Sequence, residues 1–130
     1  MKDAKKSLLL VAHGSRRPSS NDEIRELTRR LAERAGDSFA SVSCAFLELA
    51  EPSIPDGIEH EVRGGADEVV VLPYFLSAGR HVVEDIPALV EPKQREHPGV
   101  SIRIAPYLGV ATGMMDLLMS AAESGVVTEA

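Results

Sequence analysis

Four short apolar segments recur along the chain and predict four β-strands. They span residues 7–12, 39–47, 68–74 and 100–104. The first contains the unbroken apolar run Leu8–Ala12, which is typical of a strand that other elements cover on both faces. In the last segment Val100, Ile102 and Ile104 alternate with polar residues, which indicates a half-exposed strand.

The first two segments between these strands carry helix signals. Ser20 and Glu23 match a capping box and predict the start of a helix that ends at Gly36. Ser53 is a candidate cap for a second helix, with Pro55 in its first turn. The apolar positions at helical spacing are Ile24, Leu27, Leu31 and Ala35, followed by Ile54, Ile58 and Val62.

Two further helices are predicted, and each leaves a question open. The third begins near residues 81–84 and contains Pro92, which costs about 3 kcal/mol inside a helix, so we expect a kink or a late start. The fourth has an apolar stripe formed by Met114, Leu117, Leu118 and Ala121. That stripe fits a helix that covers its own sheet, and it fits an interface with a partner equally well.

Alternation of strands and helices predicts the α/β class, with a parallel, doubly wound sheet in three αβα layers. The expected strand order is 2-1-3-4. A length of 130 residues fits a single domain over residues 1–130, because domains usually contain about 100–200 residues.

Composition excludes several classes of function. A net charge of −6 and an aromatic content of 4% argue against a nucleic-acid-binding protein. The apolar runs are far shorter than the roughly 20 residues of a membrane-spanning helix, and the charged segment Met1–Lys6 does not resemble a signal peptide. A single cysteine, Cys44, favours a reducing, cytoplasmic location.

Three side chains of metal-binding types follow three of the predicted strands. His13 follows the first strand, Glu48 ends the second, and His81 comes after the third. Open parallel sheets bind ligands beyond the carboxyl ends of neighbouring strands, which lie about 4.8 Å apart. Two imidazoles and a carboxylate at one edge suit a divalent first-row metal. Taken singly, each residue also fits a turn, a helix start or a surface charge.

Positive charge gathers near the same strand ends. Arg16, Arg17 and Arg80 fit solvated loop charges, and together they also fit a site that attracts a polyanionic ligand. The other histidines, His60 and His97, are expected to be structural or solvent-facing. Dinucleotide, P-loop and nucleophile-elbow motifs are absent from the sequence, so nucleotide binding and simple hydrolysis are disfavoured.

The candidate residues fall within three blocks of sequence. These are Val11-Ala-His-Gly-Ser-Arg16, Ala45-Phe-Leu-Glu-Leu-Ala-Glu-Pro-Ser53 and Leu72-Pro-Tyr-Phe-Leu-Ser-Ala-Gly-Arg-His-Val-Val-Glu-Asp-Ile-Pro87. Together they resemble the sirohydrochlorin chelatases of the CbiX and SirB type, which are class II tetrapyrrole chelatases. The resemblance runs from about Leu8 to Leu118 and implies a flavodoxin-like, chelatase-like fold.

The resemblance implies insertion of Co²⁺, Fe²⁺ or Ni²⁺ into sirohydrochlorin, in cobalamin or siroheme biosynthesis. The metal is then a substrate, and no tightly bound cofactor is expected. His13, Glu48 and His81 correspond to the residues that surround the metal and carry catalysis. The implied substrate contacts are Ser15, Arg16, Arg17, Phe75, Leu76 and Arg80, with Glu84 and Asp85 orienting His81.

Many members of this family contain two similar lobes that face each other across a cleft. This chain resembles one lobe, so a homodimer is expected, with no nucleic-acid or membrane partner. Two alternatives remain at this point: a carrier of metal or tetrapyrrole that does not catalyse insertion, and a lobe that pairs with a different protein. Residue types alone do not select the metal, because His and carboxylate accept all three ions.

Overall fold

Strands and helices alternate along residues 4–125, the part of the chain that the computed structural model describes. The strands are β1 (Lys6–Ala12), β2 (Ser41–Phe46), β3 (Glu68–Pro73) and β4 (Ser101–Ile104). The α-helices are α1 (Pro18–Ala35), α2 (Ile54–Arg63), α3 (Ile86–Glu96) and α4 (Met114–Ala122). Short helical turns cover Gly36–Ser38, His81–Asp85 and Leu108–Val110.

All four strands form one parallel sheet in the order β2-β1-β3-β4, which confirms the predicted topology. The register places Leu10 of β1 opposite Cys44 of β2 on one side and opposite Leu72 of β3 on the other. The carboxyl ends of β2, β1 and β3 therefore lie next to one another.

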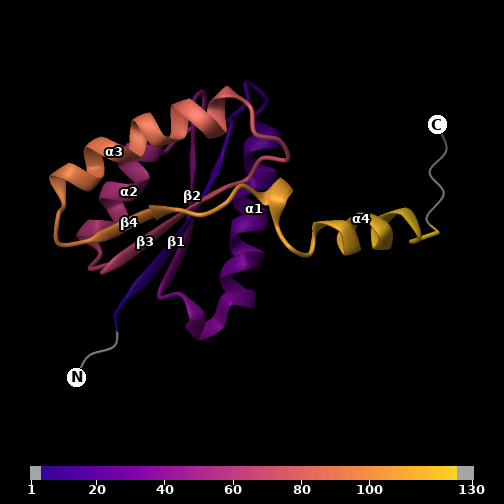
Figure 1. The fold of residues 1–130 in the computed structure, drawn as a ribbon, viewed down its shortest axis with the longest axis horizontal. Helices are drawn as coiled ribbons and strands as arrows, with labels where there is room; N and C mark the ends of the chain where they lie inside the picture. Colours follow the sequence, from indigo (N-terminus) through magenta and orange to yellow (C-terminus); the bar gives the residue numbers. More distant parts are fainter. Residues whose placement is uncertain (1–3, 126–130) are drawn as a thin grey trace.

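Helices cover the sheet unequally on its two faces (Figure 1). α1 packs on one face against β2, whereas α2 and α3 pack together on the other face. Right-handed crossovers require this division, because the chain moves in one direction from β1 to β2 and in the opposite direction from β2 to β3 and to β4. The main core lies on the α2–α3 face and includes Leu9, Val11, Ala45, Ile54, Ile58, Val69, Val71, Ile86, Val90 and Ile102.

Of the two predicted helix starts, one is confirmed and one is wrong. Ser53 caps α2, and its Oγ accepts a hydrogen bond of 3.2 Å from the backbone N–H of Asp56. Ser20 does not cap α1, which begins two residues earlier at Pro18 and has Arg17 at its N-cap without a side-chain bond. Proline favours the first helical position because its φ is already helical and its missing N–H is not needed there, which moves the start upstream.

The third helical segment begins at His81, within the predicted range, and does not start late enough to remove Pro92 from the interior of α3. A π-helical turn covers His81–Asp85, and α3 begins only at Ile86. Pro92 lies inside α3 and cannot donate to the carbonyl of Ala88, a residue on the exposed side of the helix. Water can therefore satisfy the carbonyl that the proline leaves without its helical partner.

α4 does not cover the sheet from which it emerges. Figure 1 shows it projecting away from the other helices and the strands. Met114 is buried at its start, whereas Leu117 and Leu118 are 60% and 53% exposed. Of the two interpretations of the apolar stripe, packing on its own sheet is therefore not the arrangement observed.

Candidate metal site at the carboxyl edge of the sheet

Backbone pairing continues beyond the ends of β1 and β2 and positions the loop that carries His13. The N–H of Leu47 donates to the carbonyl of Ala12 at 2.9 Å, and the N–H of Glu48 donates to the carbonyl of His13 at 3.0 Å. Gly14 follows with φ of 96°, and a Cβ atom on it would lie 1.7 Å from the carbonyl oxygen of Glu48. Only glycine fits this position, both sterically and conformationally.

This pairing brings the three predicted metal-binding residues together. His13 Nε2 lies 2.8 Å from Glu48 Oε2, and the rings of His13 and His81 lie 4.7 Å apart between centroids, tilted by 31°. All three side chains face solvent, since those of His13 and Glu48 are 50% and 53% exposed and that of His81 is 40% exposed. His13 and Glu48 are therefore in contact and the ring of His81 lies beside that of His13, but the donor atoms of these three residues do not all lie within 4.8 Å of one another.

Asp85 holds the ring of His81, whereas Glu84 does not. His81 Nδ1 lies 2.8 Å from Asp85 Oδ2, across one turn of the π-helical segment. Because an ionised carboxylate only accepts hydrogen bonds, this contact places a hydrogen on Nδ1 and leaves Nε2 outside the bond. Glu84 instead pairs with Arg80, at 3.4 Å. Both acidic residues were predicted to orient His81, but only Asp85 contacts it.

Two open hollows flank these side chains. One of about 660 Å³ lies beside α1 and includes His13, Gly14 and Ser15 in its lining. The other, of about 360 Å³, lies against α3 and includes Glu48, His81 and Asp85. The candidate residues therefore lie between two open spaces and are not enclosed in a cavity.

The loop between β1 and α1 is held by Asn21, a residue that the sequence did not single out. Asn21 Oδ1 accepts from the N–H of Ser15 at 2.9 Å, and its Nδ2 donates to the Ser15 carbonyl at 2.8 Å. Ser15 Oγ in turn accepts from the N–H of Arg17 at 3.0 Å. Asn21 falls inside the segment interpreted as a capping box, and that interpretation concealed its role.

The remaining predicted substrate residues lie near the same edge. Arg16 and Arg17 are exposed, and no carboxylate among residues 4–125 forms an ion pair with either of them. Leu76 is 72% exposed. Phe75 is partly buried against the core, with its ring centroid 6.4 Å from that of His81. Phe75 therefore contributes more to fixing His81 than to an exposed apolar surface.

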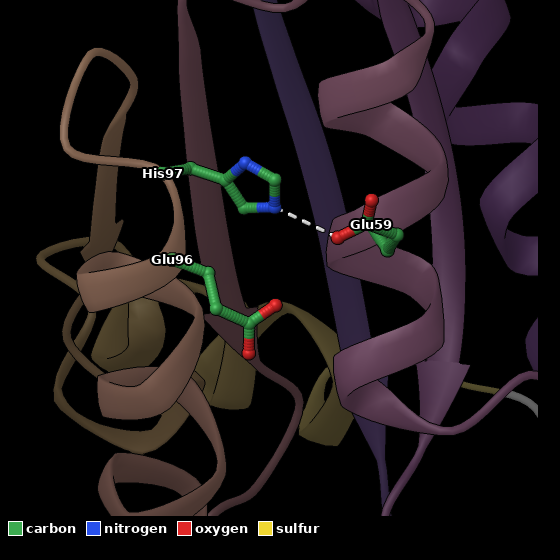
Figure 2. A group of neighbouring side chains, drawn as sticks. All are labelled: Glu59, Glu96 and His97. Atoms are coloured by element: carbon green, nitrogen blue, oxygen red, sulfur yellow. Dashed lines mark hydrogen bonds and ion pairs between the residues drawn. The ribbon is translucent and has the colours of Figure 1, made fainter.

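A second group of possible metal ligands lies between α2 and α3. Glu59, Glu96 and His97 place one donor atom each within 4.8 Å of one another, and within the described segment this is the group of three that meets that spacing. Figure 2 shows His97 directed at Glu59, with Nε2 at 2.7 Å from Oε1. Lys93 Nζ lies 2.7 Å from the same oxygen and 2.9 Å from Glu96 Oε1. The ammonium group already bridges both carboxylates and Arg63 also pairs with Glu59, so the group is an ion-pair network that joins α2 to α3.

The charges in this network alter two pKa values. Hydrogen bonds from Lys93, Arg63 and His97 lower the pKa of Glu59 from 4.5 to about 2. The bond to Glu59, with a second to Glu96, raises the pKa of Lys93. His97 was expected to be structural or solvent-facing, and its bond to Glu59 fits a structural role.

The fold and this edge define an open parallel α/β protein that presents histidine and carboxylate side chains at the strand ends. Within residues 4–125, no helix has both the length and the apolar character needed to cross a membrane. The chain belongs to the CbiX family, whose family model matches residues 7–124. The family expected from the three sequence blocks is confirmed.

The chain is similar to relatives of about its own length and to longer ones. Sirohydrochlorin ferrochelatase, chloroplastic, of Arabidopsis thaliana is 40% identical over 111 residues, which are 85% of this chain and 48% of that protein. Sirohydrochlorin cobaltochelatase of Sulfolobus acidocaldarius is 33% identical over 122 residues, which are 94% of each chain. The structure of SirB from Bacillus subtilis with Fe³⁺ superposes with a TM-score of 0.78 at 28% identity, covering 96% of this chain and 49% of SirB. The chain thus spans about half of the Arabidopsis protein and of SirB, and nearly all of the Sulfolobus protein.

Replacing Gly14 should disrupt the site through the backbone. We expect Gly14→Ala to lower the free energy of unfolding by about 1–3 kcal/mol, because the new Cβ meets the Glu48 carbonyl and φ is positive. Gly79→Ala is the matched control on the same edge, since no atom lies within 4 Å of its Cβ position. Urea denaturation measures the free energy of unfolding of both variants. An equal loss of stability in Gly14→Ala and Gly79→Ala would contradict the close approach of Gly14 to the Glu48 carbonyl.

The network around Glu59 should stabilise the fold at neutral pH and lose this effect in acid. The folded-state pKa of Glu59, about 2, lies below its ordinary value of 4.5, so its stabilising contribution is present above pH 4.5 and is lost as the pH falls toward 2. We expect Glu59→Gln to have a lower free energy of unfolding than the unsubstituted protein near neutral pH. This difference should become smaller as the pH falls from 4.5 toward 2. Denaturant unfolding at several pH values measures this difference, and one that stays constant down to about pH 2 would count against the network.

Proposed function

We propose that this chain is a sirohydrochlorin chelatase that inserts Co²⁺ or Fe²⁺, with Ni²⁺ as a third candidate, into sirohydrochlorin. The observation that carries the proposal is the His13–Glu48 contact with His81 beside it, at the open edge of a CbiX-family sheet. The names of the Sulfolobus and Arabidopsis relatives support cobalt and iron respectively. Cobalamin and siroheme biosynthesis are the corresponding pathways, and the single cysteine favours a reducing compartment such as the cytoplasm.

His13 and Glu48 are spaced to hold a metal ion between them. Ligand bonds of roughly 2.0–2.2 Å that meet at a right angle place the two donor atoms about 3 Å apart. His13 Nε2 and Glu48 Oε2 are separated by 2.8 Å, so a metal ion beside this contact can reach both atoms once the two side chains rotate to direct their lone pairs at it. His81, with Nδ1 bonded to Asp85, offers Nε2 from the neighbouring loop.

The same groups can balance the protons of the reaction. Insertion of a divalent ion displaces two pyrrole N–H protons from the macrocycle. As the metal leaves His13 and Glu48, one of the two protons restores their hydrogen-bonded contact of 2.8 Å, and the second passes to Nε2 of His81 or to water. Exposure of both side chains suits a site that must release its metal, in contrast to a closed structural site with four protein ligands.

Basic side chains around the edge are suited to the carboxylates of the macrocycle. Arg16 and Arg17 are exposed at the start of α1, and Arg80 is 79% exposed after β3. Ser15 lies in the lining of the hollow beside α1, and Leu76 offers an exposed apolar surface. We assign these residues to substrate binding, and we assign Phe75 an indirect part in it through its packing behind the ring of His81.

The proposed enzyme needs a second lobe to complete the cleft. Both hollows at this edge are open to solvent, and the chain matches about half of the Arabidopsis protein and of SirB. The Sulfolobus relative, which this chain covers over 94% of its length, is named as a cobaltochelatase. We infer that residues 1–130 form one lobe and that a second copy supplies the facing wall.

Loss of the metal-binding side chains should abolish turnover. We expect His13→Ala and His81→Ala each to slow Co²⁺ insertion by about 100-fold or more, since each removes a donor at the metal or a proton acceptor. Asp85→Asn should slow it by about 10–100-fold by releasing the ring of His81. The assay follows the visible spectrum of sirohydrochlorin after addition of Co²⁺, relative to the reaction without protein.

His60→Ala is the matched control, because His60 is an exposed histidine on α2 away from this edge. Its insertion rate should equal that of the unsubstituted protein. If His13→Ala and His81→Ala keep the full rate, the assignment of the site is wrong. Stoichiometric binding of metal or tetrapyrrole without any turnover would instead identify a carrier.

A further inference from the structure

The loop between β2 and α2, which carries Glu48, contains a strained residue. Leu49 directly follows Glu48 and has φ of 65°, in the left-handed region that leucine rarely adopts. Its side chain is more than half exposed, so burial of this side chain does not hold the backbone in place. A strained backbone persists where the surrounding structure restrains it, and such positions are typical of functional sites. The restraint on this loop therefore comes from contacts of its other residues.

Backbone bonds fix the two ends of the loop. The N–H of Phe46 donates to the carbonyl of Pro52 at 2.9 Å, and Phe46 also forms an isolated parallel bridge with Ser53. The N–H of Glu48 donates to the carbonyl of His13 at 3.0 Å. These bonds close the loop at its base, and the strained residue lies between them.

Arg25 of α1 contacts this loop at two points. Its Nη2 donates to the carbonyl of Glu51 at 3.1 Å, and its guanidinium carbon lies 5.1 Å from the centroid of the Phe46 ring. Phe46 is fully buried and ends β2, two residues before Glu48. Asp22, on the preceding turn of the helix, accepts from Arg25 Nη1 at 3.0 Å and orients the guanidinium group. One side chain therefore joins α1 to both ends of the strained segment.

The same helix also holds the loop that carries His13. Asn21 is buried, and its amide bonds both the N–H and the carbonyl of Ser15. Asn21 and Arg25 are four residues apart, so their side chains lie on neighbouring turns of one face of α1. Because one helix contacts both loops, the spacing between His13 and Glu48 depends on these two contacts.

We propose that Arg25 is a positioning residue that keeps the carboxylate of Glu48 at His13. It acts through Glu51 and Phe46, by holding the loop in the conformation in which Leu49 is strained. When the guanidinium group is removed, Leu49 relaxes to negative φ, and the adjacent Glu48 leaves its contact of 2.8 Å with His13. The effect on metal binding rests on the proposed function, whereas the effect on the loop involves no metal.

Hydrogen exchange of the Glu48 N–H in the metal-free protein tests the effect on the loop. This N–H is bonded to the His13 carbonyl, so its protection reports whether the loop is in place. Arg25→Met keeps an unbranched side chain over Phe46 and removes the donor to Glu51. We expect it to speed exchange of the Glu48 N–H by about 10-fold. Amides in the middle of β1 report on global unfolding and should keep their protection.

A Co²⁺ titration without tetrapyrrole tests the effect on the metal site. We expect Arg25→Met to raise the Kd for Co²⁺ by about 10-fold, as is usual when a group that orients a metal ligand is lost. Adding Leu49→Asn to Arg25→Met should restore much of the affinity and of the Glu48 protection, because asparagine tolerates positive φ. A role of Arg25 in general stability would not be relieved by this second change.

Arg29→Met is the matched control, because Arg29 lies one turn further along α1 and its partners, Glu26 and Glu33, are on the same helix. Its exchange rates and its Kd should equal those of the unsubstituted protein.

Three results would overturn the role of Arg25. They are unchanged exchange of the Glu48 N–H in Arg25→Met, equal effects of Arg25→Met and Arg29→Met, and no recovery on adding Leu49→Asn. Equal Co²⁺ affinity of His13→Ala and the unsubstituted protein would instead contradict the proposed metal site, and the exchange rates would still decide whether Arg25 holds the loop.

Discussion

The adjacency of the carboxyl ends of β2, β1 and β3 is the constraint on which the rest of this molecule depends. Each strand delivers one loop to the same edge, and backbone bonds past the strand ends bring His13 and Glu48 into contact. Gly14 allows this closure because its hydrogen atom lies where any side chain would meet the Glu48 carbonyl. The chemistry therefore follows from strand order and from one close backbone approach, with His81 added from the third loop.

Where local pattern and long-range packing agree, the sequence predicted the structure well. Apolar runs located all four strands, short right-handed connections led to a parallel sheet, and the expected order β2-β1-β3-β4 is the one observed. Placing the candidate residues at the strand ends then predicted the convergence of His13, Glu48 and His81 without coordinates. Ser53 was recognised as a cap because its hydroxyl needs only the next turn of the same helix.

The failures concern interactions that depend on more distant neighbours. The capping-box pattern at Ser20 was overridden by Pro18, which starts α1 earlier and leaves Asn21 free to hold the preceding loop. Asp85 and Glu84 have different partners because of the π-helical turn. Its geometry places the carboxylate of Asp85 at His81 and the carboxylate of Glu84 at Arg80. The direction of α4 depends on the anchoring of Gly109 to a distant loop, for which the stripe of apolar residues carries no signal.

Two histidine–carboxylate groups exist in this chain, and their surroundings separate their roles. At Glu59 and His97 a lysine ammonium lies between the carboxylates, whereas at His13 and Glu48 the cations near the edge point to solvent and the pair remains available to an ion. A cobalt-edge anomalous difference map of crystals grown with Co²⁺ distinguishes the two groups most directly. The predicted result is a peak at roughly 2.0–2.2 Å from donor atoms of His13 and Glu48, with His81 adjacent. A peak only at Glu59, Glu96 and His97, with none at the carboxyl edge, would contradict the proposed site.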